Sequence, residues 1–299
     1  MPETIFYALP MSTAVKTEIQ RLLAERRLRP QKKFGQNFLL DHNLLAVIAN
    51  YATADDYVLE VGPGTGRLTE KLLATGAEVL AVEIDRGLAA LLQDRLGDRA
   101  NFQLLGGDIL SGKNALNAEV LATVAARRGA KKNLRCIANL PYSAGTPFIA
   151  NLCADSLPWQ TAIFLLQYEV AERLFAAAGT DHYGGLAARA ALAGKGQILR
   201  PVPPEVFYPR PAVKSALVKF DFFSAAERAQ IDWKTLDILL AAIFRHRRKT
   251  LAKCLREKIP PAPLAAALAA TGLTGNERGE DLSPETLRRL SVAAADFLK

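Results

Sequence analysis

The sequence has no hydrophobic run long enough to span a membrane, and no basic stretch followed by an apolar segment that would mark a secretory signal peptide. Its three cysteines, Cys136, Cys153 and Cys254, are scattered, odd in number and form no Cys-x-x-Cys pair. Its three histidines are equally dispersed. These scarcities argue against a membrane protein, a disulfide-stabilised secreted domain and a metalloenzyme. We therefore expect a cytoplasmic protein without a metal site.

Positive charge is in excess, and it is spread unevenly along the 299 residues, whose formal net charge is +8. Residues 1–33 hold seven Lys or Arg against three Asp or Glu, residues 34–189 hold 13 against 16, and residues 190–299 hold 18 against 11. A mildly acidic middle between two basic ends suggests a catalytic core whose flanks bind a polyanion. A surface of solvated basic side chains is the alternative.

The order of predicted elements indicates an α/β domain followed by helices. Apolar strands alternate with helical segments from Tyr57 onward, which is typical of a parallel doubly wound sheet, and only helices follow Phe223. Met11 is the only methionine after Met1, so translation could begin at either, and residues 1–10 are assigned no role. The predicted strands are 57–61, 78–82, 102–105, 135–138, 162–166, 197–201 and 214–222, the last with one wet face; the predicted helices include 14–27, 233–244, 245–258, 263–271 and 284–298. We predict a basic N-terminal extension at 1–33, a catalytic domain at 34–223 and a small all-helical RNA-binding domain at 224–299.

A glycine-rich turn follows the strand predicted at 57–61. Gly62, Gly64 and Gly66 let the backbone approach a ligand and expose amides at the start of the next helix. A dinucleotide-binding fingerprint would need glycine three residues after Gly64, where Arg67 stands. The pattern, which begins at Glu60, instead resembles motif I of S-adenosylmethionine-dependent methyltransferases. A turn that only joins a strand to a helix is the alternative.

Carboxylates follow the next two predicted strands. Glu83 comes directly after its apolar strand, where it can accept hydrogen bonds from both hydroxyls of a ribose. Asp85 is better placed to cap the following helix. Asp108, after Gly107, can accept a hydrogen bond from the adenine amine of a cofactor. Glycine, Glu and Asp at three consecutive strand ends predict an adenosine-type cofactor.

A motif for holding an amino-bearing base closes the apolar run 136–138. The side-chain oxygen of Asn139 and the carbonyl of Leu140 can accept hydrogen bonds from an exocyclic amine. Pro141 bends the backbone, and the ring of Tyr142 can stack on the flat base. Because this motif lies downstream of the cofactor turn, we predict an enzyme rather than a binding module.

The helix predicted at 245–258 is basic and amphipathic. Leu251, Cys254 and Leu255 can face inward, while Arg245, Arg248, Lys249 and Arg256 fall on one helical face. Such a face suits RNA phosphates, with RNA recognised by shape more than by base edges. A basic cluster within residues 26–33 is a second candidate contact. The candidate RNA-binding residues are Arg245, Arg247, Arg248, Lys249, Lys253 and Arg256.

Taken in order, these motifs resemble one family, the small-subunit ribosomal RNA adenine dimethyltransferases (the KsgA family), over about residues 29–290. The resemblance implies a Rossmann-like methyltransferase fold and S-adenosyl-L-methionine as the cofactor. It implies contacts of Asn37 and Leu39 with the methionine part of the cofactor, and a cofactor site completed by Gly62, Glu83, Asp108 and Asn139. It also implies that Phe207 faces Tyr142 across the target adenine, although Phe207 could instead anchor its proline-rich loop in the core. The motifs are Gln36-Asn37-Phe38-Leu39, residues 60–66, Glu83, Gly107-Asp108, residues 139–142 and residues 244–250.

The resemblance further implies N6,N6-dimethylation of two adjacent adenosines near the 3′ end of 16S rRNA, in the small ribosomal subunit or its precursor, during ribosome assembly. We expect a monomer. The alternatives are a large-subunit rRNA methyltransferase of the antibiotic-resistance type, a DNA adenine methyltransferase, and a non-catalytic assembly or transcription factor. The helical tail and the 244–250 motif argue against the first, and the intact site residues argue against the last.

Overall fold

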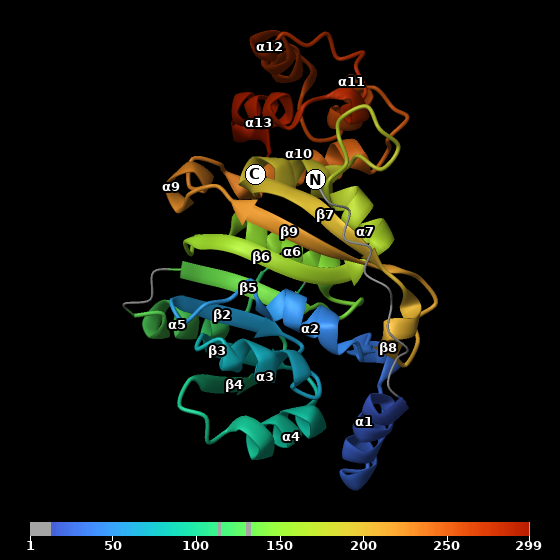
Figure 1. Cartoon of the computed structure of the whole chain (residues 1–299). Coiled ribbons are helices and arrows are strands. Elements are labelled where there is room, and N and C mark those ends of the chain that lie inside the picture. The colour runs from blue at the N-terminus through green and yellow to red at the C-terminus, as the bar shows by residue number, and fades with distance from the viewer. Residues whose placement is uncertain (1–12, 113–114, 130–132, 299) are drawn as a thin grey trace, which may run out of the picture. The chain divides into compact units, whose positions relative to one another are not determined.

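The structure is a computed structural model that describes residues 13–112, 115–129 and 133–298 (Figure 1). Residues 1–10, the choice between Met1 and Met11, and part of a basic loop expected at 127–132 therefore lie outside the described residues. The chain divides into two compact units. Unit 1 comprises Met1–Gly145, Ile163–Gln167 and Arg200–Leu217; unit 2 comprises Thr146–Ala162, Tyr168–Leu199 and Val218–Lys299. The predicted boundaries after residues 33 and 223 stay a prediction.

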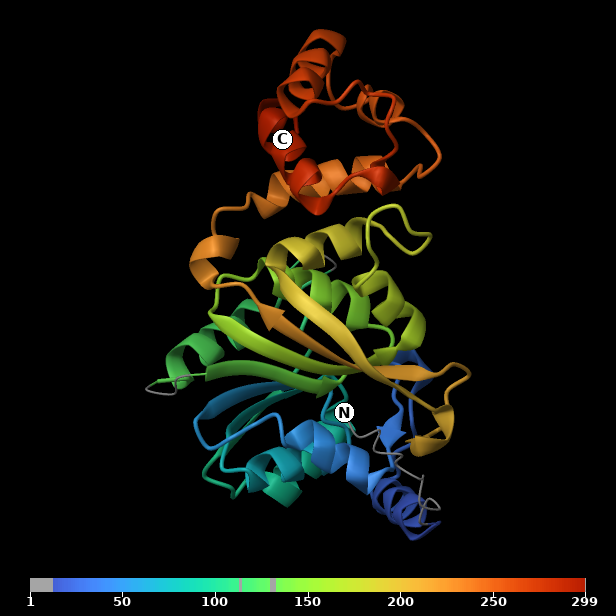
Figure 2. The same cartoon turned by 45° about the horizontal axis from the view of Figure 1, so that its top comes forward.

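A seven-stranded sheet with the order β4-β3-β2-β5-β6-β9-β7 contains all the strands predicted from the sequence. Its neighbours β4, β3, β2 and β5 lie side by side in Figure 1 and Figure 2. The strands are β2 (Asp56–Val61), β3 (Glu78–Glu83), β4 (Phe102–Gly106), β5 (Asn133–Asn139), β6 (Trp159–Gln167), β7 (Gly194–Val202) and β9 (Ser215–Phe222). The expectation of one wet face on β9 is wrong for its first half, because Ser215, Ala216, Leu217 and Val218 are all buried.

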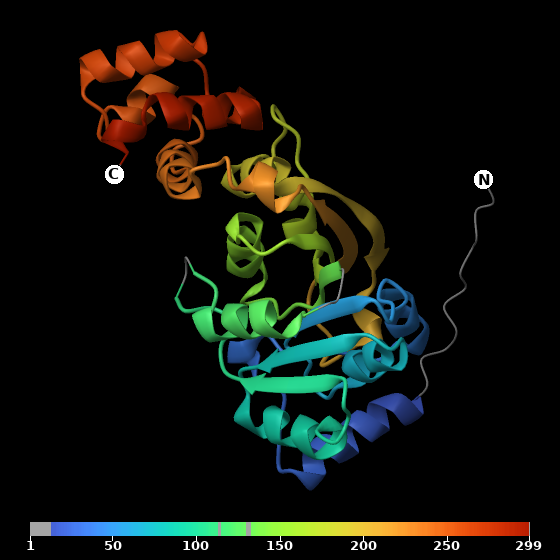
Figure 3. The ribbon, with the colours of Figure 1, turned by 90° about the vertical axis from the view of Figure 1, so that its left-hand side faces the viewer.

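Strands β2, β3, β4 and β5 run in parallel, and this positions the site. β2 pairs in parallel with β3 and with β5, and β3 pairs in parallel with β4. The arrows of β3 and β4 point the same way in Figure 3. All six residues of β2 are buried, as expected for a strand covered on both faces. Parallel strands end at the same edge of a sheet, so Val61, Glu83, Gly106 and Asn139 meet at one edge.

The helices that connect these strands begin at residues that favour a helix N-terminus. α3 (Arg67–Ala74) starts after Gly66, whose φ of 85° is left-handed. The carboxylate of Asp85 accepts hydrogen bonds from the amides of Gly87 and Leu88, so it caps α4 (Arg86–Leu96) as predicted. Asn117 caps α5 (Ala118–Arg127) in the same way. The strand-ending residues therefore lead directly into ordered turns.

The N-terminal part of unit 1 packs on α4. α1 (Thr13–Glu25) buries Ile19 and Leu23 in a cluster with Leu88 and Leu91. It is followed by η1 (Lys32–Phe34), β1 (Phe38–Leu39) and α2 (His42–Ala49). β1 pairs antiparallel with β8 (Phe207–Tyr208), which follows the short helix η2 (Pro204–Val206). The proline-rich segment is thus ordered, as predicted.

Unit 2 is mainly helical, and its C-terminal helices are drawn in orange and red in Figure 2. A core that includes Tyr183, Leu239, Leu251 and Leu287 holds these helices together. Helix α10 has the predicted bounds. The helix predicted at 284–298 ends at Ala293 and is followed by a short 3-10 turn. The helices are α6 (Gly145–Ala154), α7 (Tyr168–Leu174), α8 (Gly185–Ala193), α9 (Ala225–Arg228), α10 (Trp233–Phe244), α11 (Leu251–Leu255), α12 (Pro261–Thr271), η3 (Gly279–Asp281), α13 (Pro284–Ala293) and η4 (Ala295–Phe297).

The prediction of one helix over 245–258 is wrong, and with it the prediction that the basic residues share one helical face. The chain leaves the helix after Phe244 and re-enters one only at Leu251. Thr250 has an extended backbone and forms an antiparallel bridge with Arg278, and the amide of Leu251 donates to the carbonyl of Glu277. These tertiary hydrogen bonds replace helical ones. Leu251, Cys254 and Leu255 do face inward, as predicted.

Candidate active site

A cavity of about 370 Å³ lies in unit 1 at the carboxyl edge of the parallel strands. Its volume is in the range of small-molecule sites, which suits a nucleoside-sized ligand. The cavity brings together segments that are far apart in the sequence. Its lining includes the predicted residues Asn37, Leu39, Glu60, Gly62, Gly64, Glu83, Asp108, Asn139, Leu140, Pro141 and Tyr142.

The glycine turn lies directly against the motif that ends β5. Gly62 has a φ of 67°, and a Cβ there would lie 2.9 Å from the Cγ of Pro141. Gly64 has a φ of 62°, and a Cβ there would lie 3.0 Å from the ring of Phe38. A side chain at either position would be both strained and obstructed. Glycine therefore permits the contact between the predicted cofactor turn and the predicted base-binding motif.

Gly66 has a different position from the other two glycines of the turn. It does not belong to the lining of the cavity within the described part of the chain. A Cβ on Gly66 would lie 2.7 Å from the Cδ2 of Leu92. The structure thus gives Gly66 a packing role between α3 and α4, and its contact with a cofactor stays a prediction.

Glu83 combines a place in the cavity lining with a structural role. Its buried carboxylate accepts hydrogen bonds from the amide of Gly64 at 3.0 Å and from the amide of Asp85 at 2.9 Å. Burial raises the pKa of Glu83, and these backbone hydrogen bonds act against that shift. Each carboxylate oxygen has a second lone pair, so the group can also accept from ribose hydroxyls. Asp108 also lines the cavity, and its Oδ1 accepts from the amide of Leu110 at 2.9 Å.

The side chain of Asn139 is oriented by a contact across 102 residues of sequence. Its Nδ2 donates to the main-chain carbonyl of Asn37 at 2.9 Å. A carbonyl can only accept, so the NH₂ group of Asn139 must face Asn37, and Oδ1 is left as an acceptor. The amide of Leu140 donates to the carbonyl of Leu165, which holds the following backbone in place. Asn139 is thus arranged as an acceptor in the lining of the cavity.

The two aromatic residues predicted to hold the base differ in position. Tyr142 lines the cavity, and its hydroxyl lies 2.6 Å from the Oγ of Ser215. Burial raises the pKa of Tyr142, and the hydrogen bond with Ser215 partly offsets this, so the phenol stays neutral. Phe207 is only 3% exposed, pairs with Leu39 and is not part of the cavity lining among the described residues. This is the position of a loop anchor, and a place for Phe207 opposite Tyr142 stays a prediction.

Sequence reasoning missed Gly35, which shapes the site from the N-terminal segment. Gly35 has a φ of 62°, and a Cβ there would lie 2.9 Å from the amide nitrogen of Tyr142 and 3.0 Å from that of Ser143. The neighbouring Gln36 lines the cavity and donates from Nε2 to the carboxylate of Asp85 at 3.1 Å. A single glycine beside a basic stretch carries no sequence signal for such a contact.

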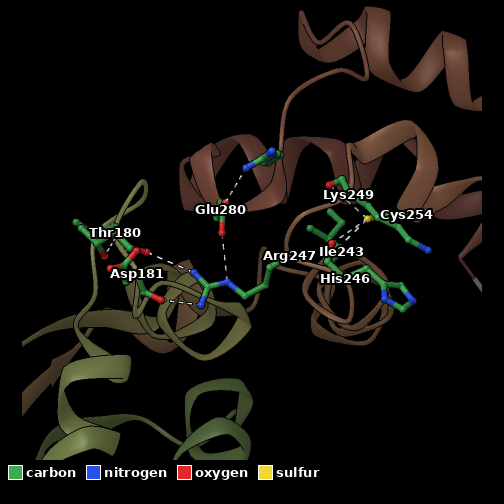
Figure 4. A network of polar contacts seen from close by, with 10 residues as sticks. Thr180, Asp181, Ile243, His246, Arg247, Lys249, Cys254 and Glu280 are labelled. Carbon is green, nitrogen blue, oxygen red and sulfur yellow. Dashed lines mark hydrogen bonds and ion pairs between the residues drawn. The ribbon is translucent and has the colours of Figure 1, made fainter.

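The predicted RNA-binding residues fall into two groups. Five of them have exposed side chains: Arg245, Arg248, Lys249, Lys253 and Arg256. Arg247 differs because its guanidinium is hydrogen-bonded to the carboxylate of Glu280 and to the carbonyl of Asp181 (Figure 4).

Glu60 should make the stability of the protein depend on pH. Burial is the main cause that raises its pKa to about 8 from the ordinary 4.5, and the charge of Glu83 adds to this, while Thr69 acts against it. The folded protein therefore keeps a proton that the unfolded chain releases above pH 4.5. The free energy of unfolding should fall between about pH 4.5 and 8, by up to about 1.4 kcal/mol per pH unit from this group.

Urea unfolding of the wild type and of Glu60→Gln at several pH values measures this effect. The Gln variant should lose the slope that Glu60 causes, whereas Glu119→Gln, on the exposed side of α5, should keep it. Identical slopes in the wild type and in Glu60→Gln would contradict the assignment.

The residues of the cavity fit S-adenosyl-L-methionine. Gly62 and Gly64 line the cavity without side chains, so the backbone of the turn can approach a ligand there. Glu83 and Asp108 supply acceptors at successive strand ends, as an adenosine moiety requires. Asn139 and Tyr142 line the same cavity as these acceptors.

Comparison with known proteins identifies relatives of the chain. The chain matches the model of the ribosomal RNA adenine dimethylase family over residues 27–296. It is 33% identical over 292 residues to ribosomal RNA small subunit methyltransferase A of Shouchella clausii, with 96% of this chain and 97% of the relative covered.

Two solved structures share the fold. A dimethyladenosine transferase from Plasmodium falciparum has a TM-score of 0.69 and 23% identity, with 87% of this chain and 98% of that chain covered. The 23S rRNA methyltransferase ErmE has a TM-score of 0.55 and 22% identity, with 86% and 98% covered. These likenesses confirm the predicted Rossmann-like methyltransferase fold.

The family match extends over the glycine turn, both strand-end carboxylates and the base-binding motif, as well as the C-terminal helices. It confirms the predicted enzyme class, an rRNA adenine dimethyltransferase, and the predicted cofactor, S-adenosyl-L-methionine. The chain belongs to the ribosomal RNA adenine dimethylase family.

Proposed function

We propose that this enzyme dimethylates N6 of two adjacent adenosines near the 3′ end of 16S rRNA, during assembly of the small ribosomal subunit in the cytoplasm, and that it acts as a monomer. The name of the Shouchella clausii relative, which specifies the small subunit, supports the choice of RNA. The observation that carries the chemistry is the orientation of Asn139, which lines the cavity and whose Oδ1 is left as an acceptor because Nδ2 donates to Asn37.

In this mechanism, residues of the cavity make the exocyclic amine of adenine a better nucleophile. When bound, the cofactor supplies an electrophilic methyl group on a sulfonium. The lone pair of the adenine amine is delocalised into the ring, and acceptors for both N–H groups favour a more tetrahedral nitrogen. In the proposal, Oδ1 of Asn139 and the carbonyl of Leu140 are these acceptors. The methylated amine loses its proton readily, so the chain needs no strong base, and orientation can supply roughly 7–11 kcal/mol of the barrier reduction.

The target base has to leave its stack to reach this site. We assign one stacking face to Tyr142, whose ring is held by the hydrogen bond to Ser215. Phe207 is the proposed second face, and its side chain must leave its buried position to serve in this way. We propose that phosphates of the RNA bind the five exposed cations of residues 245–256.

A transfer assay with three nucleic-acid substrates tests the proposal. The protein is incubated with labelled cofactor and with under-methylated small subunits, large subunits or duplex DNA, and the modified base is mapped. We expect label on two adjacent adenosines of small-subunit RNA. Label on large subunits alone, as for a 23S rRNA methyltransferase, would overturn the proposal, and label on no substrate would favour a non-catalytic assembly factor.

A further inference from the structure

The turn at residues 245–249, here called the basic turn, concentrates positive charge without the support of a helix. Arg245, Arg248 and Lys249 are exposed within five residues. Like charges this close repel one another, which favours an open, variable backbone. Other contacts in unit 2 must therefore hold the basic turn in one conformation.

Arg247 provides a contact of this kind from inside the basic turn (Figure 4). Its Nη1 donates to the carbonyl of Asp181 at 2.6 Å, and its Nη2 lies 3.5 Å from the carbonyl of Thr180. Its Nε donates to Oε2 of Glu280 at 3.3 Å. The guanidinium is thereby committed to three acceptors of the protein, unlike the exposed side chains of Arg245 and Arg248.

The partners of Arg247 are themselves anchored. Glu280 lies in η3, and its carbonyl accepts from the amide of Gly179, so η3 is joined to the segment that carries Thr180 and Asp181. The hydroxyl of Tyr183 donates to the carbonyl of Leu282. Arg247 therefore attaches the basic turn to a segment and a short helix that are already held together.

The other side of the basic turn lies over a buried thiol. The Sγ of Cys254 is 3.8 Å from the carbonyl oxygens of Ile243, His246 and Lys249 (Figure 4). The amide of Lys249 also donates to the carbonyl of His246. Cys254 thus contacts the backbone carbonyls of the turn, and Arg247 joins the turn to Glu280 and Asp181.

We infer that Arg247 is a positioning residue for RNA: it binds Glu280 and the Thr180–Asp181 carbonyls instead of phosphate, and so presents Arg245, Arg248 and Lys249 to the RNA. The inference rests on the proposed function. Arg247 was predicted to bind RNA directly, and the inference instead makes it a residue that positions the cations around it. It also gives Glu280 a role that charge alone does not explain, because a carboxylate beside this surface lowers the local positive potential.

Variants of Glu280 provide the test, because positioning and charge predict opposite signs. Affinity for under-methylated small subunits is measured over a series of salt concentrations. Glu280→Gln should bind roughly tenfold more weakly than wild type, although it removes a negative charge. Asp281→Asn, on the next residue of η3 and exposed, removes the same charge and should bind as tightly as wild type or more tightly. Tighter binding by both variants would overturn the inference.

Variants of Arg247 complete the test. Arg247→Gln and Arg247→Lys should both match Glu280→Gln in affinity, and the double variant with Glu280→Gln should be no weaker than either single one. Their salt dependence should equal that of wild type, whereas Arg248→Gln should lower the slope by about one phosphate contact. The opposite result would be a weaker salt dependence of affinity for Arg247→Gln together with near-normal affinity for Arg247→Lys. It would show that Arg247 contacts a phosphate directly, and it would refute the positioning role.

Two controls separate folding and function from the inference. Thermal unfolding shows that each variant is folded at the assay temperature, and cofactor affinity should equal that of wild type, since the cavity lies in unit 1 and the changes lie in unit 2. If wild type binds and methylates a different RNA, the proposed function fails, and the same variants are compared on the RNA that it does methylate. Equal affinity of Glu280→Gln and wild type on that RNA would then reject the inference itself.

Discussion

Asn139→Ala is expected to slow methyl transfer by a factor on the order of 10²–10³ or more, while affinity for small subunits changes by less than about twofold. The substitution removes the acceptor that the proposal aligns with the adenine amine. It also removes the hydrogen bond from Nδ2 to the carbonyl of Asn37, which holds the N-terminal segment against the end of β5. Single-turnover transfer rates and equilibrium binding, measured on the same subunits, separate the two effects.

Asn139→Asp is the matched variant for this prediction. It keeps an acceptor oxygen but cannot donate to Asn37, and it places a carboxylate opposite a carbonyl. We expect its rate to fall between those of the wild type and of Asn139→Ala. A normal rate for Asn139→Ala would mean that the assignment of Asn139 is wrong, whatever the Asp variant does.

Gly35→Ala is expected to reduce transfer on the order of 100-fold, although Gly35 supplies no functional group. The added Cβ would lie 2.9 Å from the amide of Tyr142 and 3.0 Å from that of Ser143, and the φ of 62° disfavours any side chain. The clash is with backbone, so the motif has to shift. A displacement of about 1 Å in a site of this kind can cost about 100-fold in rate.

Gly106→Ala is the control for Gly35→Ala. Gly106 ends β4 in the same unit, and a Cβ there would meet nothing within 4 Å. Its transfer rate should equal that of wild type. Cofactor affinity and thermal unfolding of both variants show whether the loss comes from misplacement or from unfolding. If Gly35→Ala methylates as fast as Gly106→Ala, the close contact does not position the motif.

The sequence alone was sufficient for the elements and for the strand-end residues. Continuous apolar runs predict buried parallel strands, and parallel strands end at one edge, so Glu83, Asp108 and Asn139 could be assigned to one site from their order. The cap formed by Asp85 follows from residue type and position. These features depend on local patterns and on one general rule of topology.

Features that depend on contacts between distant segments could not be derived in this way. The amide of Asn139 meets the carbonyl of Asn37 only in the folded chain, and the space beside Gly66 belongs to Leu92 rather than to the cavity. Residues 245–258 looked like one helix because Leu251, Cys254 and Leu255 have helical spacing and no Gly or Pro interrupts the segment, but the pairing of Thr250 with Arg278 separates the basic turn from α11.

The sequence by itself thus determined the fold class, the cofactor type and most of the residues around the cavity, because periodicity and strand order are local properties. Only the tertiary structure decided how those residues are held. It turned the acceptor of Asn139 away from Asn37, set Gly35 against Tyr142, and bound Arg247 to Glu280. Each of these depends on hydrogen bonds or packing between segments that no local pattern connects.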